Sequence, residues 1–214
     1  MGRRRRSLPG RSGDGSIHGR VVRAMVTKIE KLTFDQWLNL PETVEHYEIE
    51  DGVRYLSPGA TVFHQRVMRR VANPLSDFVE AHGLGEVFTP PMDILISREP
   101  LRIRQPDVLF LSAGRAVIGG PEEAMATKFL EMPPDLVVEV WSPSDTRSVL
   151  ERKLRDYQAI EVPECWVFHT ADLTASILDL TGREPRVVAT LGTEDTFRSD
   201  LLPGFELSLA QVFA

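Results

Sequence analysis

The sequence predicts an α/β fold with one mixed central β-sheet flanked by helices. Short β-prone stretches dominate the middle of the chain, segments with helical periodicity lie before and between them, and turn signals separate the elements. A length of 214 residues, of which 42% are hydrophobic, is sufficient for one good core.

The first predicted elements are a short helix, a β-hairpin and a long helix. The stretch TFDQWLNLPE predicts a helix capped by Thr33, and YEIEDGVRYLSPG alternates in polarity and turns at Asp51-Gly52. Residues 62–82 carry apolar side chains at helical spacing, and Gly83 is the stop signal. The apolar positions of this helix are Phe63, Val67, Val71, Leu75, Phe78 and Val79.

Strands dominate the rest of the chain. EVFTPPMDILIS and PDVLFLS are interpreted as consecutive strands, and loop and weak helix follow up to Pro134. The strand DLVVEVWS, a helix over residues 148–160 and the strand CWVFHT come next. Two β stretches, ASILDL and RVVATL, are joined around Thr181-Gly182, and a short closing helix begins near Ser208.

Composition excludes several classes of protein. No apolar run reaches the roughly 20 residues that a membrane helix needs, and the arginine-rich N-terminus lacks the apolar segment of a secretory signal. The single cysteine, Cys165, cannot form an intramolecular disulfide, which fits a reducing compartment and predicts a cytoplasmic protein. One cysteine also excludes a four-cysteine zinc site.

Charge divides the chain into two parts. Residues 1–24 contain seven arginines and one acid, a net charge of +6, whereas the whole chain carries −6, so the remainder carries −12. The Gly/Arg/Ser-rich composition of residues 1–24 predicts a disordered basic tail, and residues 25–214 are predicted to form one domain. The tail is either an arm that touches phosphates or a segment outside the fold. The acidic charge of residues 25–214 argues against nucleic-acid binding by that part.

Two carboxylates occupy unusual positions in apolar strands. Asp107 opens the stretch PDVLFLS, and Glu139 shares one strand face with Val137 and Trp141. An ionised carboxylate loses free energy on leaving water unless it is paired or coordinated, and two adjacent carboxylates repel. A divalent cation bound by oxygen ligands resolves both problems, and Mg²⁺ suits a site with few carboxylates. We therefore expect Asp107 and Glu139 to converge on one metal site.

A lysine lies on the apolar side of the next helix. Ser148 and Glu151 match a capping box, which predicts the start of the helix. At 100° per residue, Lys153 is the only charged residue within the apolar arc, which comprises Val149, Leu150, Leu154, Tyr157 and Ile160. Two interpretations are open. Either the lysine stem extends its ammonium to solvent, or the ammonium lies beside the two carboxylates and steadies a developing negative charge.

These residues together resemble the PD-(D/E)XK nuclease superfamily, and more specifically the Uma-two family of restriction-endonuclease-like proteins. Six stretches match in the order of the family, from about residue 30 to 205. They are YEIEDG (47–52), HQR (64–66), HGLGEVF (82–88), QPDVLFLS (105–112), PPDLVVEVWSPS (133–144) and KLRDYQAIEVPECWVF (153–168). The resemblance implies a restriction-endonuclease-like core for residues 25–214.

The resemblance also implies a metal site. Asp107 and Glu139 would ligate Mg²⁺ or Mn²⁺ with the backbone carbonyl of Val140, and Glu48 matches an early acid that completes the metal shell. Glu48 is equally consistent with a solvated hairpin position. Where the superfamily has its lysine, two residues after the glutamate, this chain has Trp141, so the resemblance implies that Lys153 supplies the ammonium from the following helix.

Four residues are candidates for the surroundings of that site. They are His64, Gln105, Trp141 and Tyr157. His64 lies on the apolar face of its helix, where a histidine is more often a hydrogen-bonded core residue than a ligand, although the HQR match favours a supporting role. Gln105 is either near the metal or an ordinary polar residue at a strand edge. Tyr157 either contacts the site or belongs to the core.

The function predicted from these residues is metal-dependent hydrolysis of DNA by an endonuclease. Asp107 and Glu139 would hold the ion and Lys153 would stabilise negative charge on the phosphate. The alternative is a catalytically inactive nuclease-fold protein that acts as a dimeric interaction or regulatory module. Resemblance to the superfamily further implies a homodimer, because paired sites cut paired strands.

Overall fold

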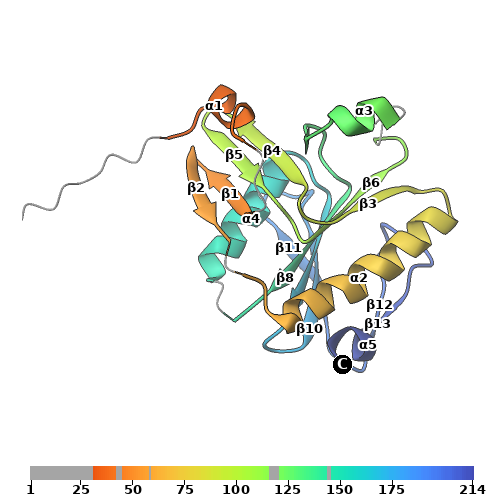
Figure 1. Cartoon of the computed structure of the whole chain (residues 1–214). Helices are drawn as coiled ribbons and strands as arrows, with labels where there is room; N and C mark the ends of the chain where they lie inside the picture. The colour runs from red at the N-terminus through yellow and green to blue at the C-terminus, as the bar shows by residue number, and fades with distance from the viewer. Residues whose placement is uncertain (1–30, 42–44, 58, 116–120, 144–145) are drawn as a thin grey trace, which may run out of the picture.

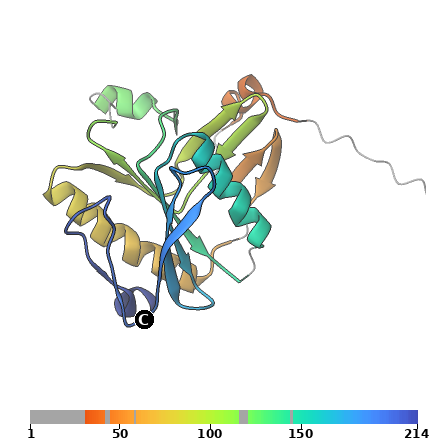
Figure 2. The same ribbon diagram turned by 180° about the vertical axis from the view of Figure 1, so that it is seen from behind.

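The computed structural model describes residues 31–41, 45–57, 59–115, 121–143 and 146–214. The predicted tail, residues 1–24, lies outside these residues. Figures 1 and 2 show the arrangement of helices around the strands from opposite sides.

The main sheet has six strands in the order β11-β10-β9-β8-β6-β3. Strands β8 and β9 are parallel and the other neighbours are antiparallel, so the sheet is mixed as predicted. Its strands are β3 (Gly85–Phe88), β6 (Val108–Ser112), β8 (Leu136–Trp141), β9 (Glu164–His169), β10 (Thr174–Asp179) and β11 (Arg186–Leu191). The predicted adjacency of the strands around residues 106–111 and 136–141 is confirmed by the pairing of β6 with β8.

A second sheet of five strands lies beside the first, in the order β2-β1-β5-β4-β7 (Figure 1). Its strands are β1 (Tyr47–Glu50), β2 (Val53–Leu56), β4 (Asp93–Arg98), β5 (Leu101–Arg104) and β7 (Phe129–Leu130). Two expectations are corrected here. EVFTPPMDILIS contains two strands that belong to different sheets, and LRIR forms a strand, β5, that the sequence analysis missed. The central layer is therefore two sheets rather than one.

The hairpin turn between β1 and β2 has the predicted residues and a matching backbone. Asp51 and Gly52 both have positive φ values, 50° and 81°. Positive φ at both central positions is the requirement of a type I′ turn, whose twist matches that of the flanking strands. This turn holds β1, which carries Glu48, in antiparallel register with β2.

Two helices cover opposite faces of the six-stranded sheet. Helix α2 (Val62–Ala81) packs with α5 (Leu209–Phe213) on the face that includes Val138 and Val140. Helix α4 (Arg147–Ala159) packs through Leu154 and Tyr157 on the other face, which includes Val137. Because side chains alternate along β8, Glu139 is on the face covered by α4.

The remaining elements are short. Helix α1 (Phe34–Leu38) has the predicted cap, in which the Thr33 side chain accepts a hydrogen bond from the Gln36 backbone N–H. The others are α3 (Pro121–Ala126), β12 (Thr196–Phe197) and β13 (Leu207–Ser208). The capping box predicted at Ser148 is wrong, because α4 begins at Arg147 and its N-cap, Thr146, makes no side-chain capping bond.

None of the helices in the described ranges combines the length and the hydrophobicity that crossing a membrane requires.

Candidate active site

The ammonium group of Lys153 lies at the centre of the candidate site. Its Nζ is 2.8 Å from Glu139 Oε2 and 2.9 Å from Glu48 Oε1. Burial alone lowers the pKa of Lys153, but the negative charges of Glu139 and Glu48 outweigh burial and raise the pKa above its ordinary value. Lys153 is therefore a cation held between two carboxylates, and the alternative of an ammonium extended into solvent is wrong.

Glu139 is a buried carboxylate that accepts two hydrogen bonds. It lies on β8 and is 5% exposed. Oε2 accepts from Lys153, and Oε1 accepts from the hydroxyl of Tyr157 at 2.5 Å. Burial raises the pKa of Glu139 to about 7, the charges of Asp107 and Glu48 raise it as well, and Lys153 opposes the shift. Tyr157 is thus both a core residue and a partner of the site, so its two interpretations are compatible.

Asp107 immediately precedes β6 and is hydrogen-bonded to the backbone of β8. Its Oδ2 accepts a hydrogen bond of 2.7 Å from the backbone N–H of Val140. The β6–β8 register, which pairs Val108 with Val138, places Asp107 next to the strand position of Glu139. The other carboxylate oxygen, Oδ1, is 3.5 Å from His64 Nε2. The structure therefore places Asp107 beside the strand position of Glu139, as expected from the sequence, and His64 next to Asp107.

Glu48 reaches the site because a buried arginine holds it there. Arg104, on β5, is 3% exposed, and its Nη1 donates to Glu48 Oε2 at 2.9 Å while its Nε donates to Asp156 Oδ2 at 2.7 Å. Burial lowers the pKa of Arg104, but Glu48 and Asp156 more than offset it and raise the pKa above its ordinary value. For Glu48, burial raises the pKa. The positive charges of Lys153 and Arg104 outweigh burial, so the pKa of Glu48 lies below its ordinary value.

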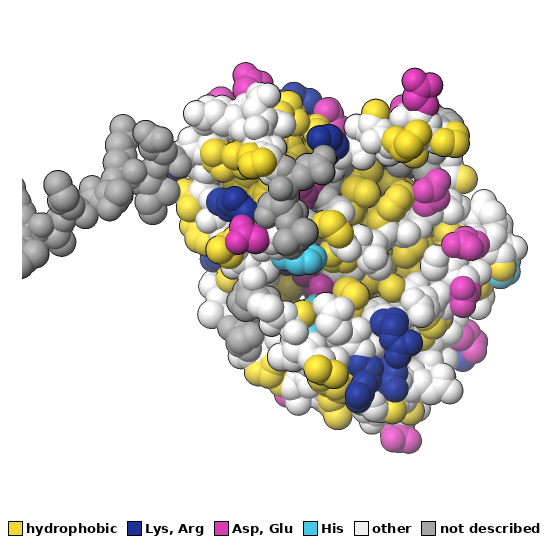
Figure 3. Space-filling model, in the orientation of Figure 1, with side chains coloured by type: hydrophobic (Ala, Val, Ile, Leu, Met, Phe, Trp, Pro, Cys, Tyr) yellow, Lys and Arg dark blue, Asp and Glu magenta, His cyan; other side chains and the backbone are white. Residues whose placement is uncertain are grey.

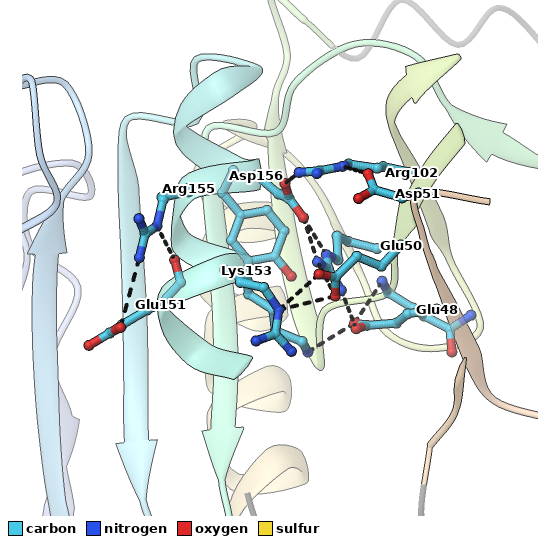
Figure 4. A network of polar contacts seen from close by, with 12 residues as sticks. Glu48, Glu50, Asp51, Arg102, Glu151, Lys153, Arg155 and Asp156 are labelled. Atoms are coloured by element: carbon cyan, nitrogen blue, oxygen red, sulfur yellow. Dashed lines mark hydrogen bonds and ion pairs between the residues drawn. The ribbon is translucent and has the colours of Figure 1, made fainter. Parts of the chain in front are cut away.

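Figure 4 shows this ion-pair network between the hairpin and helix α4. Asp156 also accepts from Arg102 Nη1 at 2.8 Å, and Glu50 pairs with Arg152 at 2.9 Å. Sequence reasoning missed Arg104 and Asp156. The available signals were the alternating arginines of LRIR and the position of Asp156 directly before the buried Tyr157.

A second group of polar residues adjoins Glu48. The backbone N–H of Gln105 donates to Glu48 Oε1 at 3.4 Å, and its side-chain Nε2 donates to Asp93 Oδ1 at 3.0 Å. His46 Nδ1 lies 2.9 Å from Gln105 Oε1. Burial raises the pKa of Asp93 to about 6, and the charge of Glu48 adds to the shift. Gln105 therefore contacts Glu48, one of the candidate site residues, and sequence reasoning missed Asp93 and His46.

Trp141 does not join this cluster. Its side chain packs against the core between β8 and α4, and its backbone carbonyl accepts from Thr170. In the part of the chain that the structure describes, no hydrogen bond links Trp141 to the three carboxylates. The expected place of Trp141 beside the metal is therefore not supported.

The donor chemistry of the site fits a divalent cation. Glu48, Asp107 and Glu139 supply hard carboxylate oxygens, which Mg²⁺ and Mn²⁺ prefer. Burial raises the pKa of Glu139, Lys153 lowers it, and the charges of Asp107 and Glu48 raise it further, so a bound cation would favour the ionised carboxylate. Over the described residues, no trio of His, Cys, Asp or Glu side chains stands at metal-binding distances as the side chains lie here. The fit accordingly rests on ligand type and charge.

Comparisons with known proteins agree with the fold. A crystal structure of "a putative nuclease belonging to DUF820" from Anabaena variabilis ATCC 29413 superimposes with a TM-score of 0.70 at 15% sequence identity. The superposition covers 85% of this chain and 97% of that chain, and at this identity it shows a shared fold. A search of curated proteins finds no match. The model of the Uma2 family, described as "Putative restriction endonuclease", matches residues 33–210, a range that contains every site residue named above. The chain therefore has a restriction-endonuclease-like fold and belongs to the Uma2 family.

Proposed function

We propose that this protein is a Mg²⁺- or Mn²⁺-dependent endonuclease that hydrolyses phosphodiester bonds in DNA. The observation that carries the proposal is the position of Lys153, whose ammonium lies between Glu139 and Glu48. Asp107 is hydrogen-bonded to the neighbouring residue of β8, Val140. This arrangement suits metal-assisted phosphodiester hydrolysis, in which carboxylates hold the ion and a nearby cation stabilises developing negative charge. Membership of the Uma2 family supports the same reaction class.

Asp107, Glu139 and Glu48 are the proposed metal ligands, together with the backbone carbonyl of Val140. When bound, the divalent ion supplies Lewis-acid polarisation of the phosphate and lowers the pKa of a coordinated water. The N–H of Val140 orients Asp107, and the hydroxyl of Tyr157 orients Glu139. These hydrogen bonds from groups next to the ligands fix the carboxylate positions in advance, which is the usual task of residues around a metal site.

Lys153 is the proposed electrostatic catalyst. Its Nζ is held by two carboxylates, so the ammonium is already positioned and needs no reorganisation when negative charge develops on the phosphate oxygens. His64 and Gln105 would support the ligands, since His64 lies beside Asp107 and Gln105 binds Glu48 through its backbone. Arg104 would keep Glu48 directed at the site.

Nicking of plasmid DNA tests the proposal. Supercoiled and linear DNA are incubated with the purified protein in EDTA, Mg²⁺ or Mn²⁺, and the products are separated on agarose gels. We expect cleavage with metal only, and none by Glu139→Gln, which keeps the side-chain size and removes the charge. Glu151→Gln is the matched control, because Glu151 is a more exposed carboxylate on α4 that pairs with Arg147.

Two kinds of outcome would count against the endonuclease. Metal-independent cleavage, or equal cleavage by wild type and Glu139→Gln, contradicts the proposal. Binding of DNA without cleavage under any metal condition favours the alternative, a catalytically inactive interaction module. The homodimer and the cytoplasmic location stay predictions, and light scattering of the purified protein measures the oligomeric state.

A further inference from the structure

Most of the described arginines are paired with Asp or Glu, and the exceptions are concentrated on one helix. Ten of them form ion pairs with Asp or Glu: Arg54, Arg98, Arg102, Arg104, Arg115, Arg147, Arg152, Arg155, Arg186 and Arg198. Within the described ranges, Arg66, Arg69, Arg70 and Arg183 form no ion pair with Asp or Glu. Three of these four lie within two turns of α2.

The three arginines share the solvent-facing side of α2. Arg69 and Arg70 follow Arg66 by three and four residues, a spacing that places side chains on one helix face. The opposite face carries the buried residues Val67, Val71 and Leu75. The helix has no acidic residue before Asp77. A strip of positive charge without Asp or Glu partners, defined by Arg66, Arg69 and Arg70, therefore lies on a domain that is otherwise acidic.

A groove about 350 Å³ in volume adjoins the basic strip between α2 and α5. Arg69, Arg70, Asn73 and Gln211 contribute polar side chains to its lining. Arg70 also donates to the backbone carbonyls of Val212 and Ala214, which holds the end of α5 against α2. Guanidinium and amide N–H groups are the donors that proteins direct at phosphate oxygens. The groove thus presents donors suited to a phosphate group beside the apolar side chains of Pro74, Leu207 and Val212.

The basic strip lies on the helix that also carries His64, a neighbour of the candidate active site, although His64 is on the opposite, inward face of α2. His64, two residues before Arg66, lies 3.5 Å from Asp107. Figure 3 shows the dark-blue patch over α2 on the same face as histidine and acidic side chains between α2 and the β1–β2 hairpin. A ligand that spans both features has to be longer than a single anion, and it has to carry several negative charges.

We infer that the basic strip binds the backbone phosphates of duplex DNA whose scissile phosphodiester lies at the candidate active site. This inference rests on the proposed function and adds the surface by which an acidic protein holds a polyanion. Arg66 and Arg69 would make the phosphate contacts, whereas Arg70 is engaged in hydrogen bonds to the end of α5. Contacts of this kind carry no sequence information, so the strip supplies affinity and orientation rather than sequence specificity.

The salt dependence of DNA binding tests the inference. Binding of a fluorescein-labelled duplex is measured by anisotropy in EDTA, so that metal-dependent cleavage does not contribute, over a series of KCl concentrations. For Arg66→Gln/Arg69→Gln the slope of log K against log[KCl] should become shallower by about 1.8, since each phosphate contact contributes about 0.9. The control, Arg183→Gln/Arg186→Gln, removes the same charge from the β10–β11 turn and the start of β11 and should keep the wild-type slope.

The outcomes separate this inference from the proposed function. An unchanged slope in Arg66→Gln/Arg69→Gln, an equal change in the control, or no measurable binding by wild type overturns the inference. A slope that depends on the strip, in a protein that cuts no DNA with Mg²⁺ or Mn²⁺, supports the inference and contradicts the endonuclease. Efficient metal-dependent cutting with an unchanged slope supports the endonuclease and contradicts the role of the basic strip.

Discussion

The ammonium of Lys153 lies 2.8 Å from the carboxylate of Glu139, although one residue belongs to helix α4 and the other to strand β8. The two elements are consecutive in the chain, and α4 packs back on the sheet that contains β8. The same ammonium is 2.9 Å from Glu48, which belongs to the other sheet. Lys153 therefore joins three parts of the fold at one point. Three predictions concern this site and its supports, and a fourth concerns the stability of the β10–β11 turn.

Lys153→Met should reduce cleavage by about two to three orders of magnitude, the effect expected from the loss of one preorganised electrostatic stabiliser. Methionine fills similar space, so the far-ultraviolet circular dichroism spectrum and the Mg²⁺ requirement should be retained. Single-turnover cleavage rates measure the effect. Lys153→Arg, which keeps the charge, should recover part of the rate. Wild-type rates in Lys153→Met would exclude the assigned role.

Mg²⁺ or Mn²⁺ should raise the melting temperature of wild type, because a ligand that binds only the native state stabilises it by about 2.7 kcal/mol at 100 times its Kd. Asp107→Asn should abolish the rise, since the amide oxygen still accepts from Val140 N–H but the charge is lost. Differential scanning fluorimetry with and without metal measures the shift.

Asp135→Asn is the matched control for that experiment. Asp135 Oδ2 accepts a 2.7 Å hydrogen bond from the backbone N–H of Ser112, so it holds a strand end in the same manner as Asp107, at the opposite end of β6. The metal-induced rise should persist in this variant. An equal rise in Asp107→Asn and Asp135→Asn would place the metal elsewhere.

Asp156→Asn should lower the free energy of unfolding by about 3–5 kcal/mol, the cost of removing one partner from a buried ion pair. Asp156 is 3% exposed and pairs with Arg104, which would keep a buried charge without this partner. Urea denaturation measures the change. Glu206→Gln, which breaks the exposed pair with Arg198, should cost no more than about 1 kcal/mol. Similar losses in both variants would refute the structural importance of Asp156.

Asp179 should contribute a pH-dependent part of the stability. Hydrogen bonds from the Thr181 side chain and backbone, and one from Arg186, lower the pKa of Asp179 from 3.8 to about 2. Because the folded pKa is depressed, the contribution is fully present above pH 3.8 and is lost as the pH falls toward about 2. The melting-temperature difference between wild type and Asp179→Asn should therefore be constant near neutral pH and vanish at the acid end of this window. A melting-temperature difference that stays constant down to the acid end would contradict the assigned role of Asp179.

The sequence by itself determined the elements that carry local periodicity. Alternation along DLVVEVWS predicted a strand at residues 136–141, which are the bounds of β8, and placed Glu139 on its own face. Helical spacing placed Lys153 on the side of α4 that faces the sheet. Both inferences hold because side-chain direction in a strand or helix is fixed by residue spacing alone. The adjacency of β6 and β8 followed from chain order and apolar content.

The tertiary structure alone decided which distant residues complete the site. Strand β5 was missed because LRIR is short and half charged, and it becomes a strand by pairing with β1 and β4. That pairing buries Arg104 against Asp156 and brings Glu48 to Lys153. A buried charge is tolerated only where an opposite charge meets it, and the meeting depends on how the two sheets and α4 pack. No spacing within any single element contains that information.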